Sequence, residues 1–516
     1  MPVHGRQRLP EGHGEVLCSP PFEQWEQIAE ANALLLCALP DDLRGLRRVA
    51  RSEAVEAARR YSQAIDVERS AGPTSDLIVM TGHQPDFYHP GIWVKDFLLQ
   101  RFTDDVGALG IDLVVDTDAA GRLELRTPCL APEMHVCGIP LVDAQPGRAY
   151  VQVSVPNERD RSAFREAGLS ALRTLAAPAL ARHFGAFCEG LDAAADRATD
   201  VGALMTAARR AYERSASTDY LELPVSVQAQ ASAFRRFVAS LLLDAVHFRD
   251  VYNAELRSYR ARTGTRSLAQ PVPDLDRSGD RVECAFWLLD EAGRASMSVD
   301  AHGHLYARDR LVADLGGTPD KTVEALEREG LLLAPKALAL TLFQRLFVAD
   351  LFIHGAGGAR YDRVTDAIVG SYYGLDVPAY VVASMTLYLP LGARVTTDAE
   401  VVAVEQRLSR LEHNPDQLLG DVEFDTSDER EEAERLVQEK ASLVAAIEVP
   451  GADRKALGGR IRAVNASLAA LLAPVVAETR AELQQVRAAR NSTGVLQDRT
   501  YPFCLWDPRE VMDKVR

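Results

Sequence analysis

The chain has 516 residues, 47% of them hydrophobic, which is enough to bury the cores of two or three domains. Its net charge of −16 argues against a general nucleic-acid or anionic-membrane binder, because such proteins present a basic surface. Seven scattered cysteines without a CxxC pair favour a reduced chain with no disulfide framework and no zinc knuckle. No early apolar run is long enough to cross a bilayer, so we expect a cytoplasmic protein.

The first part of the chain predicts helices followed by a compact α/β unit. Helical periodicity covers residues 22–70. A strand is then expected at 76–80, a loop at 81–91, a helix from about 90 to 109 and a strand at 111–116. Strand, helix and strand within roughly forty residues have the size of a βαβ crossover, which implies two parallel strands.

The middle of the chain predicts a helical region and then a second α/β unit. Residues 150–262 have helical periodicity, with an amphipathic stretch over 233–262, and short strands are expected over 282–289 and 304–312. The second unit is predicted as helices at 318–329 and 335–347, a strand at 350–354, the loop GAGG, a helix at 359–373 and a strand at 379–383.

Charged helices are expected over 397–413 and 430–490. Apolar residues there alternate spacings of four and three, which is typical of paired helices: Leu457, Ile461, Val464, Leu468, Leu471 and Val475. The segment VPGAD (449–453) predicts an antiparallel hairpin, and Pro474 should interrupt its second arm. Pairing within one chain and pairing between two chains both fit this pattern, so a homodimer is one expectation.

Two loops are the candidate site, TGHQPDFYHPG (81–91) and HGAGG (354–358). Ligands of open parallel sheets bind at the carboxyl ends of the strands, where both loops are expected. His83 and His354 lie at these strand ends, and Lys95 follows about one turn into a helix. Free N–H groups at helix starts and in glycine-rich turns favour a carboxylate or a phosphate. A tight turn and hydrogen-bonded structural histidines are the simpler interpretation.

Asp116 and Asp118 end the second predicted strand, where they fit an amine, a metal or a turn cap. With His83, His89 and His354 they include the ligand types of a metal site. No HxxxH or HExxH spacing supports such a site, so no metal is predicted. GxSxG, Walker A and GxGxxG motifs are also absent from the sequence.

The segment TGHQPDFYHPGIWVKD resembles the early signature of the bacillithiol-synthesis cysteine-adding enzymes (the BshC family), TGQQ-x-G-x-x-x-GP-x-Y-x-x-x-K after a strand. Thr81, Gly82, Gln84 and Lys95 match this signature. Asp86 stands where the family has a second glycine, Pro90–Gly91 inverts its GP pair, and His83 replaces a glutamine.

Two later segments resemble the same family in the same order. In APKALALTLFQRLFVADLFIHGAGGARYD, the matching residues are Pro335, Gln344, Gly355, Gly357 and Tyr361, whereas Lys336, Leu340 and Gly358 replace Asn, Arg and Glu. In the tail segment TGVLQDRTYPF, Gln497 and Arg499 match. An acidic EDHD-like motif of the family reads VDTDAAG here, so Asp116 and Asp118 remain but the histidine does not.

The resemblance implies an α/β fold: a Rossmann-like parallel-sheet core with helical connecting insertions and a C-terminal antiparallel coiled-coil hairpin. The implied divisions are the first part of the core with N-terminal helices (1–150), a helical connecting region (151–312), the second part of the core (313–395), the coiled-coil region (396–490) and a tail returning to the core (491–516).

The activity that the resemblance implies is amide formation between an amino acid, cysteine in the family, and an aminosugar-type acceptor such as glucosaminyl-malate. The cofactor is left open, with ATP or ADP as the candidate. The expected partner is a small-molecule substrate, with neither nucleic acid nor membrane. The alternatives are a nucleotidyl-transfer or sugar-metabolism enzyme, since QPDFYHPG faintly resembles the QP-x-Y-x-P-x-x-G of WbqC-like proteins, and a non-catalytic scaffold.

Site roles follow from the motif matches. Lys95 and the backbone of 81–84 would hold a carboxylate or phosphate, Asp116 or Asp118 the amine, and His83 or His354 would act as acid or base. The expected catalytic residues are therefore His83, Asp116, Asp118 and His354. The expected substrate-binding residues are Thr81, Gly82, Gln84, Tyr88, Lys95, Gly355, Gly357, Gly358, Tyr361, Gln497 and Arg499.

Overall fold

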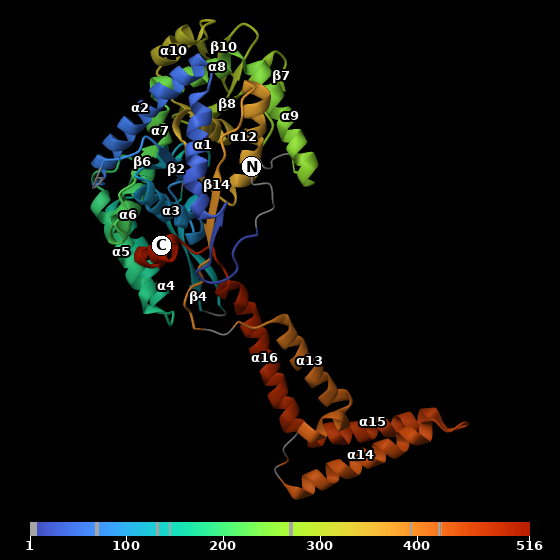
Figure 1. Ribbon diagram of the computed structural model, residues 1–516. Helices are drawn as coiled ribbons and strands as arrows, with labels where there is room; N and C mark the ends of the chain where they lie inside the picture. Colours follow the sequence, from blue (N-terminus) through green and yellow to red (C-terminus); the bar gives the residue numbers. More distant parts are fainter. Residues whose placement is uncertain are drawn as a thin grey trace. The chain divides into compact units, whose positions relative to one another are not determined.

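The computed structural model describes residues 8–67, 72–130, 134–143, 146–267, 272–392, 395–421, 424 and 426–516. The chain divides into two compact units. The main unit comprises residues 1–127, 137–389 and 499–516, and the helical unit comprises 128–136 and 390–498. Figure 1 labels their helices and strands. The tail therefore belongs to the main unit from residue 499 onward.

A six-stranded mixed sheet organises the main unit. Its order is β1 (Val16–Ser19), β14 (Val381–Met385), β13 (Leu351–Gly355), β2 (Ile78–His83), β3 (Leu109–Val114) and β6 (Leu221–Pro224). The last five strands run parallel, and β1 pairs antiparallel with β14. The predicted parallel crossover is confirmed, since α3 (Pro90–Val106) connects β2 to its neighbour β3. β1 and β6 were not predicted, because each has only four residues.

The chain leaves this sheet in opposite directions from β2 and from β13. β2 leads through α3 to β3 on one side, whereas β13 leads through α12 (Gly358–Tyr373) to β14 on the other. The carboxyl ends of β2 and β13 are adjacent, so the loops after them diverge. Such a switch point in a parallel sheet opens a crevice in which ligands bind.

Local sequence explains why these elements form where they do. β2, β3, β13 and β14 are apolar runs with few polar residues, as expected for parallel strands covered on both faces. His89 caps α3 by accepting a hydrogen bond from the Gly91 amide, and Pro90 occupies the first turn, where it needs no donor. Gly107 ends the helix in the left-handed conformation, at φ 65°.

A second, antiparallel sheet has the order β11 (Arg310–Asp314), β10 (His304–Ala307), β9 (Gly293–Val299), β8 (Arg281–Asp290) and β12 (Leu333–Pro335), with β7 (Arg277–Ser278) on β8. The helix predicted at 335–347 begins later than expected, because residue 335 belongs to strand β12. The helix itself is α11 (Ala337–Phe343), and it continues into a π-helical turn, Gln344–Val348. The amphipathic stretch over 233–262 is helical as expected and forms two helices, α8 (Ser232–Leu243) and α9 (Ala245–Thr263).

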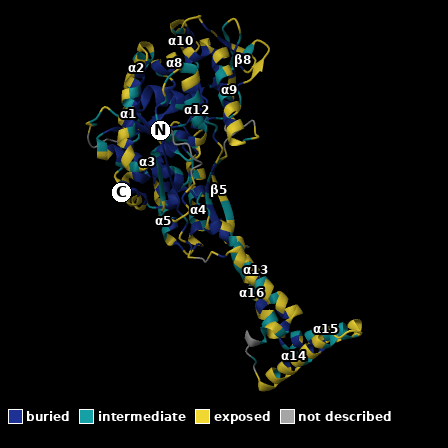
Figure 2. Cartoon of the chain, turned by 45° about the vertical axis from the view of Figure 1, so that its right-hand side comes forward, coloured by how far each residue is buried: buried dark blue, intermediate teal, exposed yellow. Residues whose placement is uncertain are grey.

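The other helices of the main unit are α1 (Trp25–Cys37), α2 (Asp41–Ala64), α4 (Glu158–Arg173), α5 (Pro178–Ala194), α6 (Val201–Glu213), α7 (Val225–Gln228), α10 (Pro319–Arg328) and α17 (Pro508–Val515). α3 packs on the sheet over β14, β13, β2 and β3. One apolar core joins the two sheets through α2, α8, α9 and α11. Figure 2 shows these buried residues as dark blue.

The helical unit contains α13 (Asp398–His413), α14 (Ser427–Ile447), α15 (Arg454–Leu471) and α16 (Ala473–Leu496). α14 packs on α15 and α13 on α16. Five of the six predicted seam residues join the core between α14 and α15, but Val475 lies on α16 outside it. The interruption at Pro474 is confirmed by a 74° bend between α15 and α16.

Among the described residues, no single helix is both long and apolar enough to cross a membrane. The bent pair formed by α15 and α16 meets that criterion of length and composition only when its two arms are taken together.

The expectation of a chain without disulfides is wrong. Cys129 ends β4 (Arg122–Cys129), Cys137 lies in β5 (His135–Asp143), and both are disulfide-bonded, whereas the other five cysteines are free thiols. These two strands pair as a separate two-stranded sheet. Sequence spacing gave no signal, because only the strand pairing brings the two positions together.

Thiol counting tests this bond. The full chain, denatured without reductant and titrated with a thiol reagent, should show five accessible thiols, and seven after reduction. Replacing Cys129 with serine should raise the unreduced count by about one net thiol at Cys137. Seven thiols before reduction would show that the bond does not form in the purified protein.

Candidate functional site

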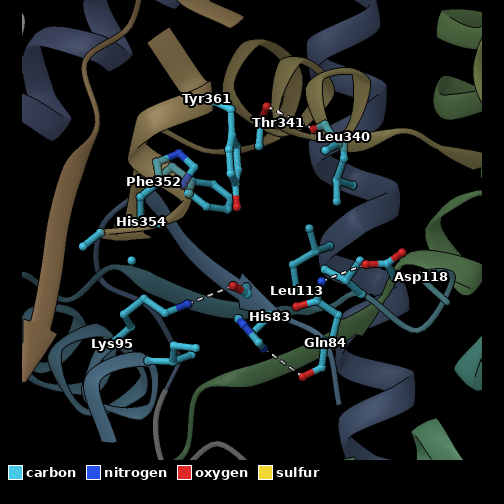
Figure 3. A pocket seen from close by; sticks show the side chains of 18 of the residues that line it. His83, Gln84, Lys95, Leu113, Asp118, Leu340, Thr341, Phe352, His354 and Tyr361 are labelled. Carbon is cyan, nitrogen blue, oxygen red and sulfur yellow. Dashed lines mark hydrogen bonds between the residues drawn. The ribbon is translucent and has the colours of Figure 1, made fainter. Parts of the chain in front are cut away.

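A cavity of about 450 Å³ opens at the switch point of the main sheet. Its wall includes the ends of β2 and β13, the start of α12, part of α3 and residues of the second sheet. Of the expected site residues, eleven line it: Gly82, His83, Gln84, Lys95, Asp118, His354, Gly355, Gly357, Gly358, Tyr361 and Arg499. In Figure 3, Lys95, His83 and Gln84 face Tyr361 and Leu340 across the cavity.

Lys95 is an almost fully buried amine on the cavity wall, with 2% of its surface exposed. Its Nζ donates to Thr81 Oγ1 at 3.0 Å and to the Gly82 carbonyl at 2.8 Å. No carboxylate forms an ion pair with it among the described residues. Burial lowers the pKa of this amine, although the nearby Asp96 opposes the effect. A ligand anion would supply the counter-charge that the protein does not.

His83 lies beside Lys95 with its Nδ1 3.1 Å from the Gln84 carbonyl oxygen. A carbonyl only accepts, so Nδ1 carries the hydrogen and Nε2 is left as an acceptor. Burial, reinforced by Lys95, lowers the pKa of His83 to about 3. The imidazole is therefore neutral at physiological pH and offers a lone pair.

Arg499 is the second cation of the cavity without a carboxylate partner among the described residues. Its Nη2 donates to Ser384 Oγ at 3.0 Å and to the Met385 carbonyl at 2.5 Å. A Cβ at Gly91 would lie 2.5 Å from this nitrogen and 2.8 Å from the Met385 oxygen. Gly91 thus leaves room for the guanidinium, which explains a glycine at the second residue of α3.

The remaining charges of the cavity wall are already paired. Asp118 accepts from Arg294 Nη1 at 2.6 Å and from Gln84 Nε2 at 2.8 Å. Lys336 Nζ donates to Glu283 at 2.6 Å and lies 4.5 Å from the centre of the Trp287 ring. The wall therefore carries two basic groups, Lys95 and Arg499, that make no ion pair with a carboxylate among the described residues, and these groups favour an anionic ligand.

His354, at the end of β13, is 5% exposed and lies between two aromatic rings. Ring centres are 4.5 Å away for Phe352 and 5.0 Å for Tyr380. Its Nε2 lies 2.7 Å from Asp362 Oδ2, which also pairs with Arg345 Nη1 at 2.7 Å. The imidazole thus has a fixed orientation and a carboxylate partner, unlike His83.

Four expected site residues do not line the cavity. Thr81 is fully buried and supports Lys95, while its hydroxyl donates to the Ile353 carbonyl. Tyr88 lies behind the loop, with its hydroxyl 3.3 Å from Asp96. Gln497 is an exposed residue of the helical unit. Asp116 is buried and turned away, where it accepts from the Ser226 amide at 2.9 Å and from the Ser226 hydroxyl. For these four, strand-end position and motif matching did not indicate side-chain direction.

Asp116 gives a pH-dependent prediction. Burial raises its pKa to about 7, although hydrogen bonds from Ser226 oppose the shift. Between about pH 4 and pH 7 the Asp116 carboxyl therefore keeps its proton in the folded state but loses it in the unfolded chain, where its pKa is about 4. The free energy of unfolding consequently falls as the pH rises to 7. Asparagine cannot ionise, so the Asp116→Asn variant should not show this fall. The difference in unfolding free energy, variant minus wild type, should increase by about 2–3 kcal/mol from pH 5 to pH 8.

Urea unfolding of both proteins at several pH values measures this difference directly, since the other titrating groups cancel. The gain should level off above about pH 8. A difference that does not change between pH 5 and 8 would contradict the buried, proton-bearing state of Asp116.

Several cavity residues escaped sequence reasoning, namely Trp287, Arg294, Thr341, Phe352 and Ser384. Trp287 and Arg294 come from β8 and β9 of the second sheet, which reaches the cavity only through tertiary packing. An arginine and a tryptophan on short strands without a motif carried no usable signal. Within the described ranges, no group of three or more His, Cys, Asp or Glu side chains is arranged to hold a metal ion.

Comparison of the sequence with models of known protein families gives no match, and comparison with curated proteins gives none either.

Proposed function

We propose that the protein is a carbon–nitrogen ligase that joins the carboxyl group of an amino acid to the amine of an aminosugar-type acceptor such as glucosaminyl-malate. One observation carries the proposal: three segments far apart in sequence, each resembling a motif of the cysteine-adding enzymes, line one cavity. They contribute Lys95, Tyr361 and Arg499 respectively. If the three resemblances were due to chance, the three segments would not be expected to line the same cavity.

The two basic groups of the wall give the substrate its first contacts. Lys95 and Arg499 would bind a carboxylate, and the backbone amides of residues 355–358, at the start of α12, would add donors aligned with the helix dipole. Gly355 and Gly357 leave this surface open, because a Cβ at either position would meet nothing closer than 4.0 Å. The reacting carboxyl group would therefore lie between α3 and α12.

The acceptor amine requires an uncharged nitrogen and a group that takes its proton. Asp118 is already held by Arg294 and Gln84, so in this proposal it orients those side chains instead of binding the amine. Arg294 and Lys336, which lie over the Trp287 ring on the cavity wall, fit a polar acceptor with an apolar ring face. His83 and His354 are the two candidate bases.

The test uses purified full-length protein with a panel of amino acids including cysteine, glucosaminyl-malate, and ATP either present or absent. Mass spectrometry should detect a product equal to the two substrates minus one water. ATP or ADP remains the candidate cofactor, because joining a free carboxylate and an amine needs activation. No condensed product with any pair would refute the ligase assignment.

A nucleotidyl-transfer enzyme is the second candidate, favoured by the glycine-rich start of α12, since such turns also suit phosphate. The same assay separates the two, because nucleotidyl transfer would release pyrophosphate and add a nucleotide mass to the acceptor.

The proposal includes four expectations that rest on the resemblance. They are a Rossmann-like classification of the parallel core, coiled-coil pairing of the helices in 396–490, a homodimer formed through them, and a cytoplasmic location. The disulfide bears on the last, because such bonds are rare in a reducing compartment. Sedimentation and cell fractionation test the dimer and the location.

A further inference from the structure

The two cavity histidines are not equivalent as proton acceptors. Protonated His83 would place a second positive charge beside Lys95 in a buried site. No carboxylate pairs with its ring among the described residues, and its Nδ1–H is directed to the Gln84 carbonyl. Asp118 is the carboxylate that acts on this ring, but burial and Lys95 outweigh it, so His83 can accept a hydrogen bond but is poorly suited to take a proton.

His354 has a carboxylate in direct contact with its ring, which His83 lacks among the described residues. Asp362 is fully buried, and its Oδ2 lies 2.7 Å both from His354 Nε2 and from Arg345 Nη1. Although burial acts to raise it, Arg345 and His354 hold the pKa of Asp362 below its usual range, so this carboxylate is ionised. The contact with His354 is oblique rather than linear, and therefore mainly electrostatic in character.

Packing decides which nitrogen of His354 faces the cavity. Phe352 and Tyr380 confine the ring, and Nε2 is the ring nitrogen that lies 2.7 Å from Asp362 Oδ2. Nδ1 lies 3.2 Å from the position that a Cβ of Gly358 would occupy, at the start of α12 on the cavity wall. Gly358 thus leaves Nδ1 uncovered on the side of the cavity.

The charges around His354 also have opposing members. They are the positive end of the α12 dipole, Arg345, and the carboxylates Asp362 and Asp366, of which Asp366 lies 2.7 Å from the same Arg345 nitrogen. The direct carboxylate contact is the closest of these, and Arg345 is shared between two carboxylates.

We propose that His354 is the proton-accepting catalytic residue of the cavity, that Asp362 and Arg345 are its positioning residues, and that His83 only accepts a hydrogen bond. This assignment rests on the proposed ligase function. As the amine nitrogen bonds to the carboxyl carbon, its proton passes to His354 Nδ1. In this step the carboxyl group is activated by ATP as an acyl phosphate or acyl adenylate, so the C–O bond to the phosphoryl group breaks. Phosphate or AMP departs with the bonding electron pair and takes the proton from His354.

The tautomer of His354 tests the positioning without any substrate. Nitrogen-15 histidine spectra of the full chain, assigned with His354→Gln and His83→Gln, should show His354 protonated at Nε2 and His83 at Nδ1. Asp362→Asn should shift the His354 tautomer ratio towards Nδ1 by about tenfold. Asp366→Asn is the matched control, because Asp366 pairs with Arg345 at 2.7 Å whereas Asp362 is the carboxylate in direct contact with His354, so this variant should change the ratio far less than Asp362→Asn.

An Nδ1-protonated His354 in the wild type would overturn the proposal, and so would an unchanged ratio in a folded Asp362→Asn variant. If that variant does not fold, the wild-type tautomer still decides. With active substrates, His354→Gln should lower kcat by at least about 100-fold with KM little changed, whereas His83→Gln should mainly raise KM. The reverse pattern would make His83 the base. Absence of any product would refute the ligase function, while the spectra would still decide the tautomer.

Discussion

Replacing Lys95 with methionine should lower kcat/KM of the proposed reaction by about 100-fold or more, because the variant loses the charge-assisted hydrogen bonds to the substrate anion. Methionine keeps the length and apolar character of the side chain, so the buried site between α3 and β2 should remain packed. The free energy of unfolding should not fall by more than about 1 kcal/mol, since a buried cation without a carboxylate partner contributes little.

Binding can be measured even where no turnover is seen. Citrate or inorganic phosphate should raise the melting temperature of the wild type, and the Lys95→Met variant should lose most of that increase. Lys455→Met is the matched control, because Lys455 is exposed on α15 in the helical unit. Equal stabilisation of the wild type and Lys95→Met by both anions would contradict the role of Lys95 in anion binding.

Arg209→Met should lower the free energy of unfolding by about 3–5 kcal/mol, the second large effect that the structure predicts. Arg209 is 5% exposed and lies at the centre of a buried cluster behind the cavity. Its guanidinium pairs with four carboxyl groups from α3, β3, α6 and β6: Asp96 at 3.5 Å, Asp112 at 3.0 Å, Glu213 at 3.2 Å and Glu222 at 2.8 Å.

The cost is large because these acids cannot reach water once their shared counter-charge is removed. Glu213 keeps its ion pair with Arg210 at 2.8 Å. Asp96 and Asp112 therefore lose the largest share of their compensating positive charge. Burial already raises the pKa of Asp96 well above its ordinary value, with Asp112 adding to the effect. At low pH, protonation of Asp96 would remove one uncompensated negative charge and so reduce the loss of unfolding free energy.

Urea unfolding monitored by tryptophan fluorescence suits this test, because the Trp93 indole donates to Glu213 at 2.6 Å within the cluster. Arg214→Met is the control: Arg214 is exposed, faces Asp66 at 4.0 Å, and should change the unfolding free energy by less than about 1 kcal/mol. Should Arg209→Met prove too unstable to purify, Arg209→Lys keeps the charge and should lose less. An Arg209→Met protein within 1 kcal/mol of wild type would show that the cluster is not held by this residue.

The cavity itself could be anticipated from local patterns. Apolar runs followed by TGHQPDFYHPG and HGAGG indicated strand-end loops, and the structure places both loops at adjacent strand ends. Lys95 was singled out by its helix position, and Arg499 by its motif. These signals are short-range, since strand periodicity and turn residues act within a few positions.

Side-chain direction was the part that local patterns missed. Asp116 and Asp118 are two residues apart, yet Asp118 faces the cavity and Asp116 turns to Ser226. Asp362, on the first turns of α12, seemed an ordinary helical acid until packing placed it against His354 and Arg345. The sequence also gave no indication of the strand pairing and the disulfide bond of Cys129 and Cys137.

The sequence by itself determined the α/β class, the parallel crossover, the interruption at Pro474 and the two loops that line the cavity. Each depends on periodicity or on backbone preferences that neighbouring residues set. Only the tertiary structure decided that Lys95 and Arg499 make no ion pair with a carboxylate in the part of the chain that the structure describes, and which histidine has a carboxylate partner. Those outcomes depend on contacts between residues distant in the chain, whose partners no local pattern can specify.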